Sequence, residues 1–245
     1  MPDGVHPVSS SLQALAEQYR TITDNLANAN TPGFKRQRVS FAQTLSQAVA
    51  GSTESTPPTG NISARSALDF SQGSLTQTGA TLDLALEGKG FFVIKTLEGD
   101  LYTRCGKFRV DGQRQIVDPS GRIVAGTGGG PIVLPASRST SDLHVSQNGT
   151  VHAGGAPVGR LEIVDFDDLS VLTQKSNGCF QAADGAEPQD AEAPCVRQGF
   201  VEGSNVSLVD ELVGLITVTR LYEANVKSIS VQDEQMKTIL QVAMS

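Results

Sequence analysis

Apolar side chains recur at alternating steps of three and four residues near both ends of the chain. This spacing lines them up along one side of a helix, and it is the pattern through which two helices pair in a coiled coil. In the first stretch these positions are Val8, Leu12, Leu15, Tyr19, Ile22 and Leu26. Polar residues separate them, and Pro32-Gly33 ends the stretch. We therefore predict an amphipathic N-terminal helix that needs a partner helix.

A longer stretch with the same spacing lies near the other end of the chain. Its predicted helix begins after Ser207, a favourable N-cap residue, and runs almost to Ser245. Thr219 and Asp233 interrupt the apolar positions, while further apolar residues widen the face. The positions assigned to this seam and its widened face are Leu208, Leu212, Leu215, Ile216, Tyr222, Val226, Ile229, Met236 and Leu240. The breadth of the face predicts contacts with more than one neighbouring helix.

The middle of the chain has a different pattern, made of short β-type runs such as LDLAL at 82–86 and FFVIK at 91–95. Asp111-Gly112 and Asn148-Gly149 each lie between such runs, where they predict hairpin turns. Residues 46–66 are rich in Ser, Thr, Gly, Ala and Pro, a composition typical of a linker or an extended arm.

Together these patterns predict an α+β protein in which long N- and C-terminal helices pair as a coiled coil and a mainly-β body is inserted between them. The expected division assigns residues 1–34 and 204–245 to a terminal helical assembly domain, 35–74 to a linker or extended arm, and 75–203 to a β-rich outer body. An ordinary α+β domain whose terminal helices pack on its own sheet is the alternative.

Composition and charge narrow the function classes. Aromatic residues make up 5% of the 245 residues and Trp is absent, so we expect a core of Val, Leu, Ile and Ala. A net charge of -7 argues against a nucleic-acid partner, because phosphate binding needs a basic face. The N-terminal segment has neither a cleavable signal pattern nor a long apolar run, which predicts no ordinary secretory signal and no membrane span.

Residues with catalytic or metal-binding chemistry are scarce and scattered. His6 precedes the first helix, whereas His144 and His152 flank a predicted turn and could face each other across a hairpin. Two His without a placed carboxylate or Cys make a weak metal site, so solvated hairpin residues are the preferred interpretation. We therefore predict no metal and no cofactor.

Acidic residues offer the remaining route to an enzyme, a glycan hydrolase using Asp165 and Asp168. These carboxylates are three residues apart at a strand end, not on opposite sides of a substrate bond, so Asp165, Asp167 and Asp168 are interpreted as a solvated turn. The chain is predicted not to be an enzyme and to have no small-molecule substrate.

The basic run and the cysteines also show no pattern of a binding or catalytic site. The run of Lys35, Arg36 and Arg38 is interpreted as a solvated stretch or a contact to an acidic neighbour. Three cysteines, Cys105, Cys179 and Cys195, lack the spacing of a zinc or redox motif. They are interpreted as incidental thiols, with a Cys179–Cys195 bridge as the alternative.

The segment NLANANTPGFKRQRVSF at 25–41 resembles the signature of the flagellar basal-body rod and hook proteins. The blocks at 68–96, 101–110 and 196–229 are also similar to that family. A physical reason for the signature is available, since Asn side chains can bond the backbone where a helix ends, Pro-Gly makes the turn and Phe provides an anchor. The motif residues are Asn25, Leu26, Asn28, Asn30, Thr31, Pro32, Gly33 and Phe34.

The resemblance implies a structural subunit of the rod of the bacterial flagellum basal body. Such a subunit is exported unfolded by the flagellar type III apparatus without cleavage, and polymerises in the periplasm with copies of itself and other rod or hook subunits. VGRLEIVDF at 158–166, the modest body and the wording EGSNV are most similar to a proximal rod subunit. A distal rod or hook-type subunit, or a monomeric β-rich binding module, is the alternative.

Overall fold

A computed structural model describes residues 5–44, 61–136, 142–175 and 178–244. The chain divides into two compact units, and each draws on separate parts of the sequence. A helical unit comprises Met1–Ala27, Gln37–Ala67 and Ser207–Ser245, and a β body comprises Asn28–Arg36 and Leu68–Val206. The chain therefore passes between the two units four times. The predicted α+β class, with a helix towards each end and a mainly-β body, is confirmed.

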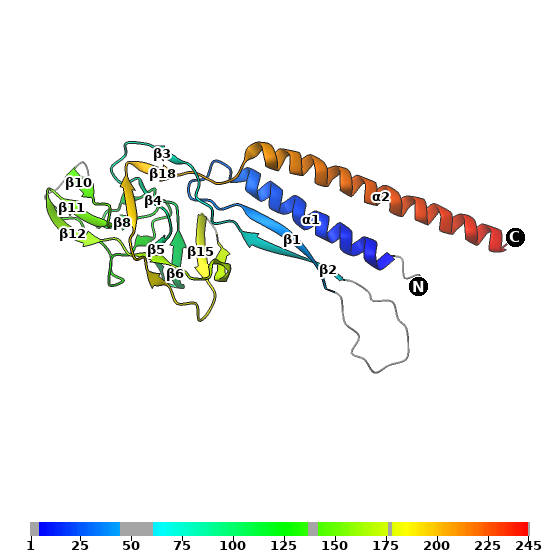
Figure 1. The fold of residues 1–245 in the computed structure, drawn as a ribbon, viewed down its shortest axis with the longest axis horizontal. Coiled ribbons are helices and arrows are strands. Elements are labelled where there is room, and N and C mark those ends of the chain that lie inside the picture. The colour runs from blue at the N-terminus through cyan, green and yellow to red at the C-terminus, as the bar shows by residue number, and fades with distance from the viewer. Residues whose placement is uncertain (1–4, 45–60, 137–141, 176–177, 245) are drawn as a thin grey trace. The chain divides into compact units, whose positions relative to one another are not determined.

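The helical unit contains two helices of unequal length. Helix α1 spans Val5–Ala27 and helix α2 spans Leu208–Met244. They lie side by side and run in opposite directions (Figure 1). In α2 the amide of Glu211 donates to the carbonyl of Ser207, so the helix begins where the sequence predicted. Within the described residues, no helix is long and apolar enough to span a membrane.

The predicted arm contains two strands that the composition of the segment did not predict. Strand β1 spans Gln37–Thr44, strand β2 spans Asn61–Leu68, and the two pair with each other. Strand β1 also contacts α1 (Figure 1). The expected linker from 46 to 66 falls largely outside the described residues. The two described parts of the arm are thus the paired strands β1 and β2, and both strands belong to the helical unit.

The β body is built from short strands. In the described part of the chain, nine of them form one sheet. Seven of these strands lie in the order β14-β15-β6-β5-β9-β8-β7, and the other two, β13 and β16, pair beside them, β13 with β5 and β16 with β13. Strands β10, β11 and β12 form a three-stranded sheet, and β17–β4 and β18–β3 are two-stranded pairs. The bounds are β3 Leu75–Gln77, β4 Leu84–Glu87, β5 Phe91–Thr96, β6 Gly99–Thr103, β7 Arg109–Val110, β8 Ile116–Val117, β9 Ile123–Val124, β10 Leu143–Val145, β11 Thr150–Ala153, β12 Ala156–Arg160, β13 Ile163–Asp165, η2 (a 3-10 helix) Leu169–Val171, β14 Leu172–Gln174, β15 Cys179–Ala182, β16 Gln189–Asp190, β17 Cys195–Gln198 and β18 Phe200–Glu202.

Both predicted hairpin turns are confirmed, by different backbone devices. Strands β10 and β11 join through Asn148-Gly149, where Gly149 takes a φ of 83°. Strands β7 and β8 join through the Asp111-Gly112 segment, but the residue with positive φ is Arg114, at 63°. The carboxylate of Asp111 accepts the amides of Gln113 and Gln115, and this bonding holds the longer turn.

Two hydrophobic clusters form the core of the β body, and one of them corrects the prediction from composition. The larger cluster is mainly aliphatic, as expected. The second is built largely on aromatic rings, because Phe91, Phe166, Phe180 and Tyr102 are buried together. Phe91 meets Phe180 edge to face, with ring centroids 5.8 Å apart. Aromatic side chains are thus a substantial part of the core of the β body.

Candidate assembly surfaces and junction residues

Asn25, a residue of the family motif, ties together three segments of the helical unit. Its side chain is buried at the end of α1. Its amide nitrogen donates to the carbonyl of Gln37 at 2.8 Å, and its oxygen accepts the amide of Gln37 at 2.9 Å. The same nitrogen lies 3.3 Å from Oε1 of Glu211, which is buried in the first turn of α2. One asparagine thereby joins the end of α1 to the beginnings of β1 and α2.

The rest of the motif makes a tight turn within the β body. The amide of Thr31 donates to the carbonyl of Asn28, and the amide of Phe34 donates to the carbonyl of Thr31. Gly33 has a φ of 71°, and a Cβ there would lie 2.3 Å from the backbone nitrogen of Cys105, so a side chain has no room. Phe34 is buried, Asn28 and Pro32 are half-buried, and Asn30 is exposed.

Next to the motif, three charged side chains form a buried group that we call the Glu202 cluster: Lys35, Arg104 and Glu202. Lys35 Nζ lies 2.6 Å from Glu202 Oε1, and the two side chains are 1% and 0% exposed. Arg104 Nη1 lies 3.4 Å from the other carboxylate oxygen. The amide of Gly73 also donates to Glu202, and Lys35 donates to the carbonyl of Ser71. For Lys35 the interpretation as a solvated stretch is therefore wrong, and the alternative interpretation, a contact to an acidic neighbour, is confirmed.

Burial governs the electrostatics of the Glu202 cluster. It lowers the pKa of Lys35, because the surrounding protein replaces water around the ammonium group, while the nearby Glu202 carboxylate partly offsets this effect. Burial likewise lowers the pKa of Arg104, again offset mainly by Glu202. The Arg104 guanidinium also lies over the ring of Phe91, 5.1 Å from its centroid. The chain thus keeps a carboxylate in its interior to hold two buried cations.

The side chain of Asn205 is hydrogen-bonded to segments of the β body that lie next to the points where the chain passes into the helical unit. Its side-chain oxygen accepts the amide of Arg36 at 2.7 Å, and its nitrogen donates to the carbonyls of Asp69 and Ser71. The amide of Asp69 donates in turn to the carbonyl of Arg36. These contacts connect the body-side ends of the crossings at 36/37, 67/68 and 206/207.

The sequence offered weak signals for these junction residues. Asn205 belongs to the block EGSNV, which carried part of the family resemblance, but nothing local assigned it a role. Glu202 and Lys35 are 167 residues apart in the chain, so their pairing has no periodic signature. The signal that could have indicated the burial of Lys35 is its position directly after the Phe anchor of the motif turn.

The predicted seam of α1 lies partly inside the helical unit. Its residues are distributed with Ile22 buried, Leu12, Leu15 and Leu26 half-buried, Tyr19 exposed, and the Val8 side chain outside those described. Ile22 faces α2, because a Cβ added at Gly214 would lie 3.3 Å from Ile22 Cδ1. Ala14, Thr21 and Asn25 are also buried on α1. The first helix therefore contributes small and polar residues as well as its apolar stripe.

The predicted seam of α2 is largely exposed in the single chain. Leu215 and Ile229 are half-buried, whereas Leu208, Leu212, Ile216, Tyr222, Val226 and Met236 are exposed, and the Leu240 side chain lies outside those described. Among the α2 side chains that the structure describes, Glu211 and Val218 are buried, each one position before a position of the predicted repeat. A shift of one residue turns the face by about 100° around the helix. Much of the apolar surface of α2 thus remains uncovered by this chain.

The acidic residues considered for an enzyme are used in local turns. Asp168 caps the short helix η2, where it accepts the amide and the hydroxyl of Ser170, and these bonds lower its pKa. Asp165 accepts the amide of Phe166, and Asp167 accepts a bond from Gln189. Across the described ranges, no group of three His, Cys, Asp or Glu could hold a metal ion.

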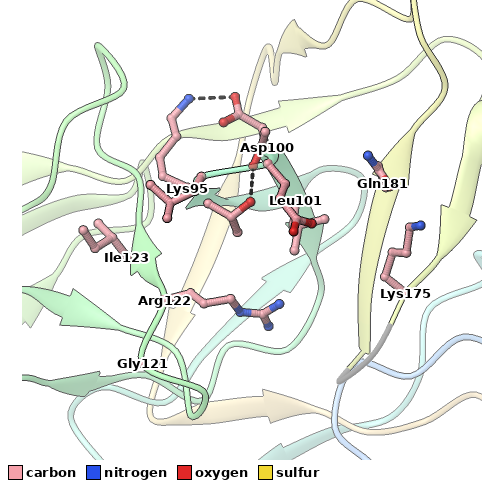
Figure 2. A pocket seen from close by; sticks show the side chains of 12 residues that line it. Lys95, Asp100, Leu101, Gly121, Arg122, Ile123, Lys175 and Gln181 are labelled. Atoms are coloured by element: carbon pink, nitrogen blue, oxygen red, sulfur yellow. Dashed lines mark hydrogen bonds and ion pairs between the residues drawn. The ribbon is translucent and has the colours of Figure 1, made fainter.

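The β body also has an open pocket of about 720 Å³ beside the β5–β6 hairpin (Figure 2). Lys95 and Asp100 lie at its edge and form an ion pair with the nitrogen and oxygen 2.7 Å apart. Arg122 lines another side, where it pairs with Asp118 and donates to Cys179 Sγ. Of the pocket's cations, Lys95 and Arg122 are thus neutralised by neighbouring carboxylates of the same chain.

The three cysteines are free thiols, so the Cys179–Cys195 bridge is not present. Cys179 is buried, and Cys105 and Cys195 are half-buried. Burial raises the pKa of Cys105 and of Cys179, which favours the protonated thiol over the nucleophilic thiolate. This supports their interpretation as incidental thiols.

Three family models match separate parts of the chain. The model described as flagella basal body rod protein matches residues 9–35, which include the end of α1 and the motif turn. The flagellar hook protein FlgE/F/G D1 domain matches residues 85–153 in the β body. The flagellar basal body rod FlgEFG protein C-terminal model matches residues 197–242, from β17 into α2.

Proteins that are similar to this chain over most of its length are likewise named as flagellar basal-body rod proteins. The flagellar basal-body rod protein FlgF of Caulobacter vibrioides is 30% identical over 93% of this chain and 92% of its own length. The rod protein FlgG of Bacillus subtilis is 32% identical over 94% and 95%, and FlgG of C. vibrioides is 34% identical over 96% and 97%. Relatives named FlgF and FlgG thus match to a similar degree. The chain belongs to the flagellar basal-body rod protein family.

Proposed function

We propose that this protein is a structural subunit of the rod of the bacterial flagellar basal body and works in motility. The membership of the family supports this proposal, because the relatives are named as rod proteins. We further propose that it assembles with copies of itself and with other rod or hook subunits, and that it catalyses no reaction.

The observation that carries the assembly proposal is the uncovered apolar face of α2. Leu212, Val213 and Ile216 are 47%, 59% and 55% exposed. Fully burying such a side chain contributes about 1.5–3 kcal/mol, so completing the burial of each contributes roughly 1 kcal/mol. A row of such residues along one helix favours the approach of other helices, since an exposed apolar patch is typical of an interaction surface.

We propose that α1 and α2 pair through the predicted seam as a coiled coil in the assembled structure, and that the remaining face of α2 contacts neighbouring subunits. On this proposal residues 1–34 and 204–245 form the inner assembly domain, 35–74 the arm and 75–203 the outer body. The assembled helices line a hollow shaft that transmits torque and passes exported subunits. The contact between Ile22 and Gly214 supports the pairing of the helices.

The finer assignment is to a proximal rod subunit, proposed from VGRLEIVDF at 158–166, the modest body and the block EGSNV. We also propose that the chain reaches the periplasm unfolded through the flagellar type III export apparatus, without cleavage of its N-terminus.

The test is incorporation of variants into purified basal bodies. Leu212→Asp places a charge on the exposed apolar face and should abolish incorporation, as should Leu15→Asp on α1. Ser228→Asp, which adds the same charge at an exposed polar position of α2, is the matched control and should be incorporated. Amide exchange in β5 and β6 should be unchanged in all variants. Normal incorporation of Leu212→Asp would refute the assembly role of this face.

A further inference from the structure

The three-stranded sheet β10-β11-β12 presents two histidines side by side. In the register of β10 and β11, His144 lies directly opposite His152. Residues opposite each other in an antiparallel pair have Cβ atoms about 4.5–5.5 Å apart, so the two side chains stand on the same face of the sheet. The sequence predicted that they could meet across the hairpin, and the register confirms it.

The opposite face of this sheet is anchored in the core. Leu143 and Val145 flank His144, Val151 and Ala153 flank His152, and all four are buried in the aliphatic cluster. Because side chains alternate between the faces of a strand, this burial fixes both histidines toward the outside. His144 is exposed and His152 is half-buried. The pair is therefore accessible but mounted on a rigid support.

Two further features concern the orientation of His152. The pairing of β11 with β12 shifts register between Val151 and His152, an irregularity of the kind that redirects a side chain. Ser146 Oγ lies 3.4 Å from His152 Nδ1. Where the Ser146 hydroxyl accepts from Nδ1–H, the unprotonated Nε2 is left to bind a metal, and an outer hydrogen bond of this kind is typical of metal-binding histidines.

The ring separation is compatible with a shared metal ion. A Zn²⁺–N bond of about 2.0–2.1 Å places the metal about 3.2 Å from each ring centroid, so two ligands at a tetrahedral angle have centroids about 5.2 Å apart. The observed centroids are 6.4 Å apart, with planes inclined by 37°. Closing the difference of about 1 Å needs a shift of the exposed His144 side chain about χ1, because rotation about χ2 leaves the ring centroid almost in place.

We propose that His144 and His152 form a bidentate site for a divalent transition metal ion of the Zn²⁺ class. The two imidazoles supply two ligands, and water completes the coordination. Imidazole suits such ions better than it suits Mg²⁺ or Ca²⁺, which prefer oxygen ligands. The site belongs to the β body, and the proposal does not depend on the proposed assembly of the helices.

The test is titration of the full-length protein with Zn²⁺ by calorimetry, with NMR detection of the imidazole resonances. His144→Gln and His152→Gln should each weaken binding at least about tenfold, because one remaining imidazole does not chelate, and the double variant should bind no more tightly than either. The two ring signals should move together to one end point. The imidazole signals report on the histidines alone, so they separate Zn²⁺ bound at this pair from any Zn²⁺ bound by the free cysteines.

His6→Gln is the matched control and should bind Zn²⁺ as the wild type does. Ser146→Ala should weaken binding about tenfold if the serine orients His152, and an unchanged affinity would overturn that role. Wild-type Zn²⁺ affinity in His144→Gln or in His152→Gln would overturn the site itself. Unchanged circular dichroism and unfolding midpoints establish that the variants are folded, since both side chains lie on the outer face.

Discussion

Glu202→Gln removes the charge that Lys35 and Arg104 share in the interior of the β body while keeping the size of the side chain. The glutamine oxygen can still accept bonds from Lys35 and from the amide of Gly73, so the substitution isolates the ionic part of the interaction. Both cations then remain buried without their carboxylate. Their desolvation is no longer offset, and the folded state should lose stability.

The expected loss is about 3–5 kcal/mol, the usual cost of removing one partner from a buried ion pair. The retained hydrogen bonds favour the lower end of that range. For a body of this size, about 1 kcal/mol shifts the unfolding midpoint by about 2–4 °C, so the midpoint should fall by about 6–12 °C.

Glu87→Gln is a matched control for this substitution. Glu87 pairs with Arg197 at 2.6 Å, the same separation as Lys35 and Glu202, but its side chain is 46% exposed. An exposed pair contributes about 1 kcal/mol at most, so Glu87→Gln should be nearly neutral. Comparing the two variants by calorimetry and by urea unfolding separates the effect of burial from that of distance.

A double-mutant cycle identifies the partner. Lys35→Met combined with Glu202→Gln should destabilise the body by less than the sum of the single losses, because the double variant no longer buries the Lys35 charge. A loss from Glu202→Gln no larger than that from Glu87→Gln would refute the reasoning. Strict additivity in the cycle would show that Lys35 and Glu202 are not coupled.

Three more predictions concern pH and the motif. The pKa of Lys35 is lowered in the folded state, so as pH rises the folded protein releases this proton before the unfolded chain does. The stability of the wild type relative to Lys35→Met should therefore rise as pH increases toward 10.5. Urea unfolding at several pH values measures this difference, and a difference that falls with pH would contradict the lowered pKa. Asn25→Ala should cost the helical unit about 1–3 kcal/mol by stranding the backbone of Gln37, seen as a lower midpoint in helical circular dichroism, whereas the exposed Asn30→Ala should have almost no effect. Gly33→Ala should destabilise the body by at least about 2 kcal/mol in thermal unfolding, because the φ of Gly33 is positive and an added Cβ meets the backbone of Cys105. At Gly112 an added Cβ meets nothing within 4 Å, so Gly112→Ala should change the free energy of unfolding by no more than about 0.5 kcal/mol.

The sequence predicted the helices, the hairpins and the motif turn because their signals are local. Periodicity over many residues defines α2 even where Thr219 interrupts it, and the turn at Gly149 follows from the Asn-Gly pair. The position of the buried face of α2 was shifted by one residue. A polar residue, Glu211, is buried there because Asn25 provides a hydrogen bond, and an apolar pattern does not detect such a position.

The junction residues could not be predicted because their partners are distant in the chain. In the sequence, Lys35 stands in a basic run that resembles a solvated surface. Its burial depends on Glu202, which the chain brings back only after the whole β body has been built. The strands β1 and β2 were missed for a similar reason, since their pairing with each other and the contact of β1 with α1 compensate for a composition typical of a linker.

The bond between Arg36 and Asn205 also bears on the order in which the protein folds. Helices α1 and α2 are separated by roughly 180 residues, and bringing their ends together directly costs loop entropy. Once the β body has formed, that bond shortens the path between Ala27 and Leu208 to roughly a dozen residues, which lowers the entropic cost by about 2.4 kcal/mol. We therefore expect the body to fold first and the helices to meet afterwards, an order that stopped-flow measurements of the two units can check. The C-terminal helix, synthesised last, then finds its partner already held nearby.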